Sequence, residues 1–233
     1  MNLNQTDKIF WHGYIDFYNK FFQNRHFSTI AEIGIWKGAS INWLLERFDN
    51  SIIHAADILP IQPEWPNSDR VTYHKIDQGN IEEVKNFFSI GKFDLIIEDG
   101  SHDPVHQVNC LKEGLNSLNE KGIYILEDIH TSLGYNVGNA LTVLLAIDHF
   151  LRLDKDINFN EASKISQNSL LSIEDVLNLS NVIKNISLYK RTHLPNFCYN
   201  CKSVEFNYSK LKCVCGTDIF SFKDSMSAVI EKK

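Results

Sequence analysis

The chain has 233 residues, of which 43% are hydrophobic, and its formal net charge at pH 7 is −6. This length and apolar content suit one sizeable α/β domain with a small appendage, and the negative charge disfavours nucleic acid and anionic membranes as partners. No stretch approaches the roughly 20 consecutive apolar residues of a membrane-spanning helix. The first residues lack the basic and apolar regions of a signal peptide, so we expect a cytoplasmic protein.

The first part of the chain alternates between strand-like and helix-like segments. The pattern predicts strands over residues 28–38 (running into a glycine-rich turn), 51–59, 71–77, 93–99 and 122–128, with helices over 39–48, 81–89 and 102–118. Because strands that alternate with helices pair through right-handed crossovers, this order predicts a Rossmann-like, doubly wound, mostly parallel sheet.

After residue 130 the pattern is less regular. We expect a long helix over residues 136–153, polar loops around one short helix over 154–179, and strands over 185–191 and 226–232. The last two strands predict a closing antiparallel hairpin. Residues 1–192 and 224–233 would then form the main domain, and residues 193–223 would form a cysteine-rich insertion in that hairpin.

Each of the five predicted parallel strands ends on acidic side chains: Glu32, Asp57, Asp77, Asp99, and Glu127 with Asp128. In open parallel sheets, ligands bind beyond the carboxyl ends of the strands. One or two such acids would be ordinary polar strand ends. Acids at the ends of all five strands indicate a ligand-binding edge.

Residues 32–40, EIGIWKGAS, predict a turn that lets the backbone approach a ligand. Gly34 and Gly38 remove the Cβ atoms that would intrude, and the next helix offers free N–H donors to an anionic group. The dinucleotide pattern needs a third glycine, and Trp36 would fit poorly against a pyrophosphate, unless Trp36 is simply part of the core.

The next two strand ends offer polar groups for a nucleoside. Asp57 can accept two hydrogen bonds from a ribose diol, and Asp77 with Gln78 can bond an adenine edge. A sugar and a base without a diphosphate loop are what S-adenosylmethionine (SAM) requires.

Four segments together resemble class I SAM-dependent methyltransferases, and more narrowly the metal-dependent O-methyltransferases of macrolide sugars in the mycinamicin and tylosin pathways. These segments are TDKxxxHGYxxFY (6–18), EIGxxxGAS (32–40), DGSH (99–102) and GIYILEDIHTS (122–132). The resemblance covers roughly residues 6–150 and the closing hairpin. It implies that SAM is lined by Lys8, Tyr14, Glu32, Gly34, Gly38, Ser40, Asp57, Asp77 and Gln78.

Asp99, Glu127 and Asp128 predict a metal site if the fourth and fifth strands are neighbours, as methyltransferase topology implies. Three unpaired carboxylates would repel one another and would be costly to desolvate. A hard divalent cation resolves this conflict, and all-oxygen ligation favours Mg²⁺, with Mn²⁺ or Ca²⁺ as alternatives. Alternatively, Glu127 or Asp128 pairs with a lysine or arginine, or caps a helix.

His102 follows Asp99 by three residues, which places its imidazole beside the predicted metal. A neutral histidine near a metal-bound hydroxyl can act as a general base, and the resemblance assigns this role to the histidine of DGSH. His106 could join His102 in a zinc motif, but Asp103 stands where that motif needs a glutamate. His130 is expected to support the site or contact the substrate.

Four of the five cysteines lie close together: Cys198, Cys201, Cys213 and Cys215. Two close pairs of thiols predict a structural Zn²⁺ site, with free thiols or disulfides as the alternatives. The C-x-C pair is closer than the usual spacing, but an insertion with little apolar content needs such a staple. The few lysines nearby do not argue for nucleic acid. The insertion is a candidate for part of the acceptor site or for a contact in a homo-oligomer.

The sequence therefore predicts a SAM- and Mg²⁺-dependent O-methyltransferase that acts on a sugar hydroxyl, either nucleotide-linked or in a precursor of a surface or capsular glycan. A natural-product or catechol-like acceptor would offer the same chemistry. Two other classes remain open. One is a metal-dependent hydrolase built on Asp99, His102 and His106, and the other is a non-catalytic SAM- or nucleotide-binding protein.

Overall fold

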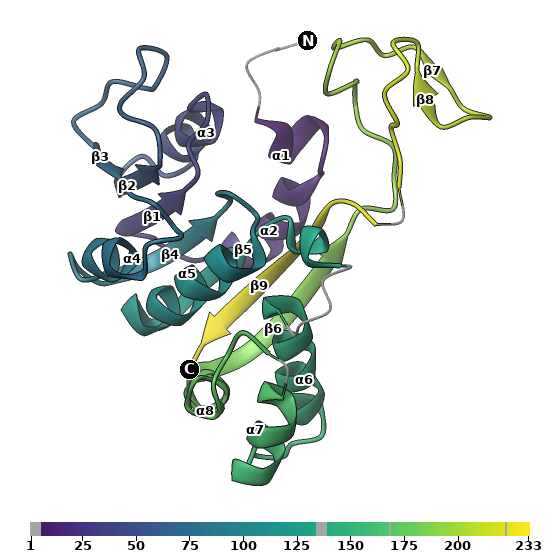
Figure 1. Ribbon diagram of the computed structural model, residues 1–233. Coiled ribbons are helices and arrows are strands. Elements are labelled where there is room, and N and C mark those ends of the chain that lie inside the picture. The colour runs from purple at the N-terminus through teal and green to yellow at the C-terminus, as the bar shows by residue number, and fades with distance from the viewer. Residues whose placement is uncertain (1–5, 134–138, 168, 222) are drawn as a thin grey trace.

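The structure is a computed structural model of the protein, and it describes residues 6–133, 139–167, 169–221 and 223–233. A seven-stranded sheet in the order β3-β2-β1-β4-β5-β9-β6 forms its centre (Figure 1). The strands are β1 (Thr29–Ile33), β2 (Ile52–Asp57), β3 (Val71–Lys75), β4 (Phe93–Glu98), β5 (Leu118–Leu126), β6 (Ile183–Lys190) and β9 (Met226–Lys232). The first five are parallel, whereas β9 runs antiparallel to both β5 and β6. The predicted Rossmann-like sheet with a closing antiparallel hairpin is confirmed.

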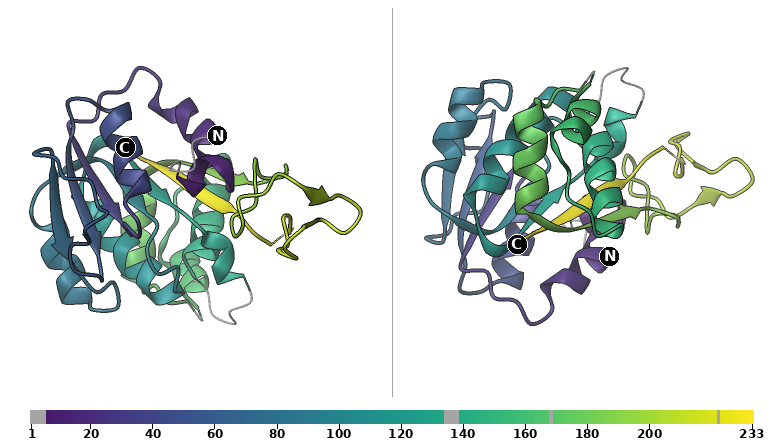
Figure 2. Two further views of the ribbon diagram at one scale, coloured as in Figure 1. Left: turned by 90° about the horizontal axis from the view of Figure 1, so that it is seen from above. Right: turned by 90° about the horizontal axis from the view of Figure 1, so that it is seen from below.

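Helices cover both faces of the sheet (Figure 2). They are α1 (Asp7–Phe10), α2 (Tyr14–Phe22), α3 (Ala39–Arg47), α4 (Ile81–Phe88), α5 (Pro104–Ser117), α6 (Ala140–Arg152), α7 (Phe159–Ser166) and α8 (Ile173–Val182), with a 3₁₀ turn, η1, over Ile129–Ser132. Successive strand residues point to opposite faces. Leu95 and Ile97 therefore pack with α2 and α3, while Ile96 packs in the core under α4 to α8.

Residues 154–179 differ from the prediction of one short helix. The structure has two helices there, α7 and α8, and that prediction was wrong. Each begins with a capping box, in which Asn158 pairs with Glu161 and Ser172 pairs with Asp175. This reciprocal pairing satisfies backbone donors at each helix start and is readable from sequence. The long helix expected over 136–153 begins at Ala140, and its first predicted residues lie outside the described part of the chain.

Residues 191–225 leave the sheet between β6 and β9 and project from the body of the molecule (Figures 1 and 2). They contain a two-stranded sheet of β7 (Phe206–Asn207) and β8 (Lys212–Cys213). Arg191 is fully buried at the base, where its guanidinium pairs with Asp224 at 3.0 Å and lies 5.0 Å from the ring of Trp11. In the described residues, no helix has the length and apolar character needed to cross a membrane.

Candidate active site

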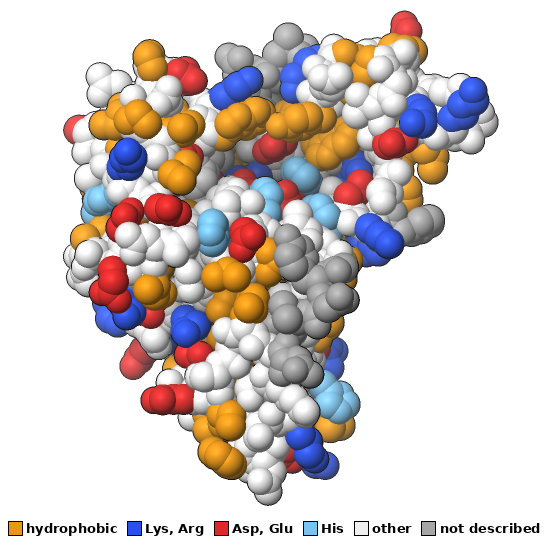
Figure 3. All heavy atoms as spheres, in the orientation of Figure 1, with side chains coloured by type: hydrophobic (Ala, Val, Ile, Leu, Met, Phe, Trp, Pro, Cys, Tyr) orange, Lys and Arg blue, Asp and Glu red, His pale blue; other side chains and the backbone are white. Residues whose placement is uncertain are grey.

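A cleft of about 1040 Å³ opens at the carboxyl ends of the parallel strands. Its walls come from the segment between Thr6 and His12, from the turns that follow the strands, and from the insertion. Acidic and histidine side chains gather in a hollow beneath a band of hydrophobic side chains (Figure 3). Among the predicted strand-end acids, the cleft is lined by Asp57, Asp77, Asp99 and Asp128. Glu32 and Glu127 are buried behind it.

The glycine-rich turn forms one wall of the cleft and has the close approach that the sequence predicts. Gly34 has φ 94°, and a Cβ atom there would lie 1.9 Å from the carbonyl oxygen of Asp99. Gly38 has φ 76° and begins α3, where a Cβ atom would lie 2.7 Å from Pro66. Any side chain at Gly34 would therefore separate β1 from the DGSH turn.

The carboxylate of Asp57 holds the same turn from β2. One of its oxygens accepts the backbone N–H groups of Ile35 at 2.8 Å and Trp36 at 3.1 Å. Asp57 also lines the cleft, as does Ser40 at the start of α3. Trp36 is 53% exposed, so it is not part of the core. The acid predicted to bind a ribose thus also shapes the glycine turn.

Gln78 supports the DGSH turn. Its amide donates to Glu98 at 2.6 Å, and its carbonyl oxygen accepts the backbone N–H of Ser101 at 2.8 Å. A Cβ atom at Gly100 would lie 1.9 Å from that carbonyl oxygen, so any side chain there would displace the Gln78 amide. Burial raises the pKa of Glu98 to about 7. Asp77 lines the cleft, and its carboxylate accepts the N–H of Gly79 at 2.8 Å.

Lys8 reaches into the group of carboxylates from α1. The side chain of Lys8 is 1% exposed. Its ammonium makes an ion pair with Asp99 and lies 3.1 Å from Glu127 and 3.6 Å from Glu32. Burial alone would lower the pKa of Lys8, but these carboxylates raise it well above its usual value. The lysine therefore stays charged. Pairing of Glu127 with a lysine was the alternative to a metal ligand in the sequence analysis, and this contact is present.

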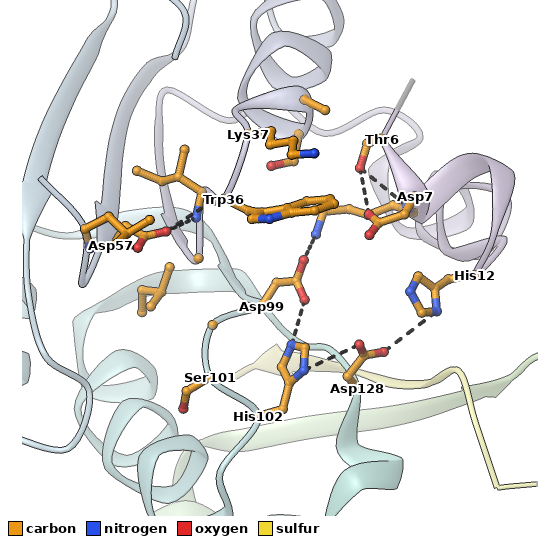
Figure 4. A pocket seen from close by; sticks show the side chains of 18 of the residues that line it. Thr6, Asp7, His12, Trp36, Lys37, Asp57, Asp99, Ser101, His102 and Asp128 are labelled. Atoms are coloured by element: carbon orange, nitrogen blue, oxygen red, sulfur yellow. Dashed lines mark hydrogen bonds and ion pairs between the residues drawn. The ribbon is translucent and has the colours of Figure 1, made fainter. Parts of the chain in front are cut away.

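A second cluster, of Asp99, His102 and Asp128, lies in the cleft (Figure 4). Ligand atoms of Asp99, His102 and Asp128 all lie within 4.8 Å of one another. His102 Nε2 lies 3.1 Å from Asp99 Oδ1, and His102 Nδ1 lies 3.7 Å from Asp128 Oδ2. Both His102 and Asp128 have a left-handed backbone, with φ 59° and 51°. Such conformations are uncommon for residues other than glycine and are often found at functional sites.

Asp128 is held from behind by aromatic and histidine side chains. The hydroxyl of Tyr14 donates to Asp128 at 2.5 Å, and Tyr14 is fully buried. The hydroxyl of Tyr14, which the resemblance assigns to the lining of SAM, is thus bonded to Asp128. Nδ1 of His12 and Nδ1 of His130 lie 3.9 and 3.8 Å from Asp128 Oδ1. His12 was not among the predicted site residues, although it is the histidine of the TDKxxxHGYxxFY segment.

The charges of this site fit a bound divalent cation. Glu32, Asp99, Glu127 and Asp128 are four carboxylates, and the cations that face them are the ammonium of Lys8 and the imidazole of His102 when it is protonated. Both carboxylate oxygens of Glu32 and one of Glu127 are buried without a hydrogen-bond partner. Burial raises the pKa of Glu32 to about 7 and that of Glu127 well above its usual value. Carboxylate oxygens are the donors that suit Mg²⁺ or Mn²⁺.

Lys8→Met should lower the free energy of unfolding by about 3 kcal/mol, because removing one partner of a buried ion pair leaves the other charge uncompensated. Chemical denaturation at neutral pH measures this loss. Lys155→Met is the matched control, because Lys155 is an exposed lysine in the loop that follows α6. Equal stability of the two variants would show that Lys8 does not neutralise the carboxylates.

The four cysteines of the insertion form a separate cluster. Their sulfurs lie within 4.8 Å of one another, with 3.7 Å between Cys198 and Cys215 and 3.4 Å between Cys201 and Cys213. A disulfide needs about 2.05 Å, whereas Zn–S bonds of about 2.3 Å place the sulfurs of a tetrahedral site about 3.8 Å apart. A hydrogen bond from the Thr217 hydroxyl lowers the pKa of Cys215 to about 6. The four thiols can hold Zn²⁺.

The comparisons with known proteins agree with this geometry. Residues 31–129 match a family of methyltransferase domains. This part of the chain is similar to methyltransferase domains. It contains the glycine turn, Asp57, the DGSH segment and Asp128, whereas Lys8, Tyr14 and the cysteines lie outside it.

The methyltransferase domain also has relatives with named activities. An 8-demethyl-8-alpha-L-rhamnosyl tetracenomycin-C 2'-O-methyltransferase of Streptomyces olivaceus is 27% identical over 112 residues, which are 45% of this chain and 29% of that protein. The MycE methyltransferase of the mycinamycin biosynthetic pathway, solved with Mg, SAH and mycinamycin VI, has a TM-score of 0.60 at 18% identity. The match covers 96% of this chain and 49% of MycE.

A second MycE structure, with Mg and SAH, has a TM-score of 0.58 at 16% identity and covers 94% of this chain and 48% of that chain. The chain thus spans less than half of the length of these relatives. The resemblance to class I SAM-dependent methyltransferases is confirmed in the matched domain and in the fold.

Proposed function

We propose that this protein is a SAM- and Mg²⁺-dependent O-methyltransferase whose acceptor is a sugar hydroxyl. The observation that carries the proposal is the cluster of Asp99, His102 and Asp128 at the open cleft, beside the glycine turn of a methyltransferase domain. A nucleophilic hydroxyl, a base and a place for a cation are what methyl transfer to oxygen requires. The proposed base, His102, and the proposed cation ligands, Asp99 and Asp128, lie together in the cleft.

His102 is the proposed general base. Its Nε2–H donates to Asp99, while Nδ1 lies 3.7 Å from Asp128, beyond hydrogen-bond reach, and is free to accept the hydroxyl proton. Burial alone would lower the pKa of His102, but the hydrogen bond and charge of Asp99 and the charges of Asp128 and Glu98 raise it to about 9. A bound Mg²⁺ would polarise the hydroxyl and offset this carboxylate charge, which favours the neutral base.

SAM supplies the electrophilic methyl group. The chain's own contribution is to hold that donor against the glycine turn. The predicted contacts that line the cleft are Lys8, Gly34, Ser40, Asp57, Asp77 and Gln78. Gly38 begins α3, and Tyr14 and Glu32 are buried. Asp99 and Asp128 are the proposed cation ligands on the cleft side. Glu127, the third predicted ligand, lies beside Lys8, with one carboxylate oxygen 3.1 Å from the ammonium. Its other carboxylate oxygen is buried without a hydrogen-bond partner.

The sugar acceptor is supported by the named relatives, one of which methylates a rhamnosyl group and another of which was solved with mycinamycin VI. A second candidate is a natural product whose apolar body carries the hydroxyl. Ile58 and Leu59 line the cleft and are 59% and 44% exposed, which favours an acceptor with an apolar part. A hydrolase is less well supported, because His106 bonds Ser101 at 2.7 Å and lies outside the acid and histidine cluster of the described residues.

Transfer of labelled methyl from SAM tests the proposal. Two acceptor panels, nucleotide sugars and glycosides with an apolar aglycone, are incubated with protein, labelled SAM and Mg²⁺. We expect label on a sugar oxygen in one panel. A protein that binds neither SAM nor S-adenosylhomocysteine (SAH) would contradict the proposal.

We also propose that the insertion, residues 193–223, holds a structural Zn²⁺ through Cys198, Cys201, Cys213 and Cys215. The support is the sulfur spacing, which is too long for disulfides and close to that of a tetrahedral thiolate site.

A further inference from the structure

The insertion contacts the cofactor side of the cleft through one aromatic side chain. Tyr199 lies in the turn between Cys198 and Cys201 and also lines the cleft. Its ring stacks on Trp36 of the glycine turn, with centroids 6.1 Å apart and planes inclined by 13°. A residue held between two proposed metal ligands thus touches the turn that would hold SAM.

Trp36 is a point of strain in that turn. Its φ is 48°, a genuine outlier for a bulky side chain. The conformation is held on the backbone side, where the Trp36 N–H donates to Asp57 at 3.1 Å and the Trp36 carbonyl accepts the indole N–H of Trp65 at 2.7 Å. The side chain reaches across the cleft above Asp99 (Figure 4). Strained residues persist only where their surroundings over-determine them, and Tyr199 supplies the contact from the insertion.

The insertion also packs on the opposite wall. Phe197, next to the first cysteine, stacks on Phe10 with ring centroids 4.2 Å apart. The backbone N–H of Asn196 donates to the carbonyl of Phe10 at 2.8 Å. Phe10 ends α1, the helix that carries Lys8 into the carboxylate cluster. One short segment therefore touches both walls of the cleft.

This segment has little core of its own. Its buried cluster consists of Cys198, Cys213 and Ile219, so two of its three members are cysteines. The strands β7 and β8 have two residues each. Small elements with so little buried apolar area need a metal or disulfides to keep their shape. The ring of Tyr199 also packs beside Phe10 and Trp11, with centroids 6.3 and 5.9 Å apart. What the cysteines bind therefore sets the backbone from which Tyr199 reaches these rings and Trp36.

We infer that Zn²⁺ binding by the four cysteines is thermodynamically coupled to cofactor binding, and that the stack of Tyr199 on Trp36 carries the coupling. The inference rests on the proposed function, because it needs a SAM site at the glycine turn. Zinc orders the turn that contains Tyr199, and Tyr199 holds Trp36 and the glycine turn in the ligand-binding conformation. Because such coupling is reciprocal, SAH should in turn strengthen zinc binding.

Calorimetric titration of SAH into the full chain tests the coupling. Each protein is kept reduced and is measured in two states, once with one equivalent of Zn²⁺ and once after treatment with a chelator that is selective for zinc over magnesium. Excess Mg²⁺ is present in both measurements. For the wild type we expect zinc removal to weaken SAH binding by about tenfold. Tyr199→Ala should bind SAH weakly in both states, and Tyr199→Phe, which keeps the ring, should behave as the wild type.

Tyr208→Ala is the matched control. Tyr208 is a 68% exposed tyrosine of the same insertion and does not line the cleft, so its removal should leave the zinc effect intact. Zinc content should be about one per chain in the wild type and in Tyr199→Ala, and should be lost when Cys198→Ser and Cys213→Ser are combined.

Three outcomes would overturn the inference: no bound zinc in the wild type, equal SAH affinity with and without zinc, or a zinc effect that persists in Tyr199→Ala. Failure of SAH to bind any form has a different meaning. It would contradict the methyltransferase proposal itself, on which the coupling depends.

Discussion

His102→Ala should lower turnover by about 100-fold or more while leaving SAH affinity nearly unchanged. General base catalysis typically contributes about 10²- to 10⁴-fold. The imidazole of His102 is 28% exposed, and His102 lines the cleft. Its Nε2 lies 3.1 Å from Asp99 and its Nδ1 lies 3.7 Å from Asp128. In the described residues, no hydrogen bond joins the His102 imidazole to the glycine turn, so the substitution should leave the structure of the cofactor site unchanged. Single-turnover rates with labelled SAM and an acceptor from the screen measure the loss.

His106→Ala separates this role from a general effect of removing a nearby histidine. His106 also lines the cleft, but its Nδ1 bonds the Ser101 hydroxyl at 2.7 Å and it lies outside the cluster with Asp99 and Asp128. We expect a much smaller loss of turnover than in His102→Ala. Unchanged turnover in His102→Ala would remove His102 from the mechanism.

Removal of divalent cations should abolish methyl transfer, and Mg²⁺ should restore it. Lewis-acid catalysis by a bound cation is worth several kcal/mol, and each 1.36 kcal/mol corresponds to about tenfold in rate, so the loss should exceed about 100-fold. Because EDTA would also remove zinc from the cysteines, the treated protein is first reloaded with Zn²⁺ alone and only then given Mg²⁺. Turnover should return in the second step.

Asp128→Asn tests the same site without a chelator. The amide keeps the shape of Asp128 and leaves an oxygen near Tyr14 and His102, but it removes one negative charge from the proposed cation ligands. We expect the Mg²⁺ concentration for half-maximal turnover to rise by about tenfold or more, with SAH affinity little changed. Full activity after thorough chelation, or an unchanged magnesium requirement in Asp128→Asn, would rule out this cation site.

The helix prediction over residues 154–179 shows how the sequence analysis failed where local signals were available. Polar composition was taken to mean loops, although Asn158 with Glu161 and Ser172 with Asp175 each have capping-box spacing. Side chains that satisfy the first backbone donors can begin a helix even where apolar periodicity is weak.

The sequence by itself determined the parallel sheet, the glycine turn and the gathering of acids at one edge. These features follow from local rules: periodicity sets strands and helices, only glycine fits the approach at Gly34, and parallel strands bring their ends together. The spacing of the four cysteines likewise indicated one cluster. Each rule acts within a few residues or through the order of the strands.

Only the tertiary structure decided which charged and aromatic partners meet. Lys8 pairs with Asp99, 91 residues further along the chain, and its ammonium also lies 3.1 Å from Glu127. The sequence predicted a metal for these carboxylates and left a lysine or arginine partner as the alternative, without indicating which one. Tyr199 of the insertion reaches Trp36 of the glycine turn. Such pairings depend on how α1 and the insertion pack over the sheet edge, and no local pattern in the sequence specifies the distance between segments so far apart.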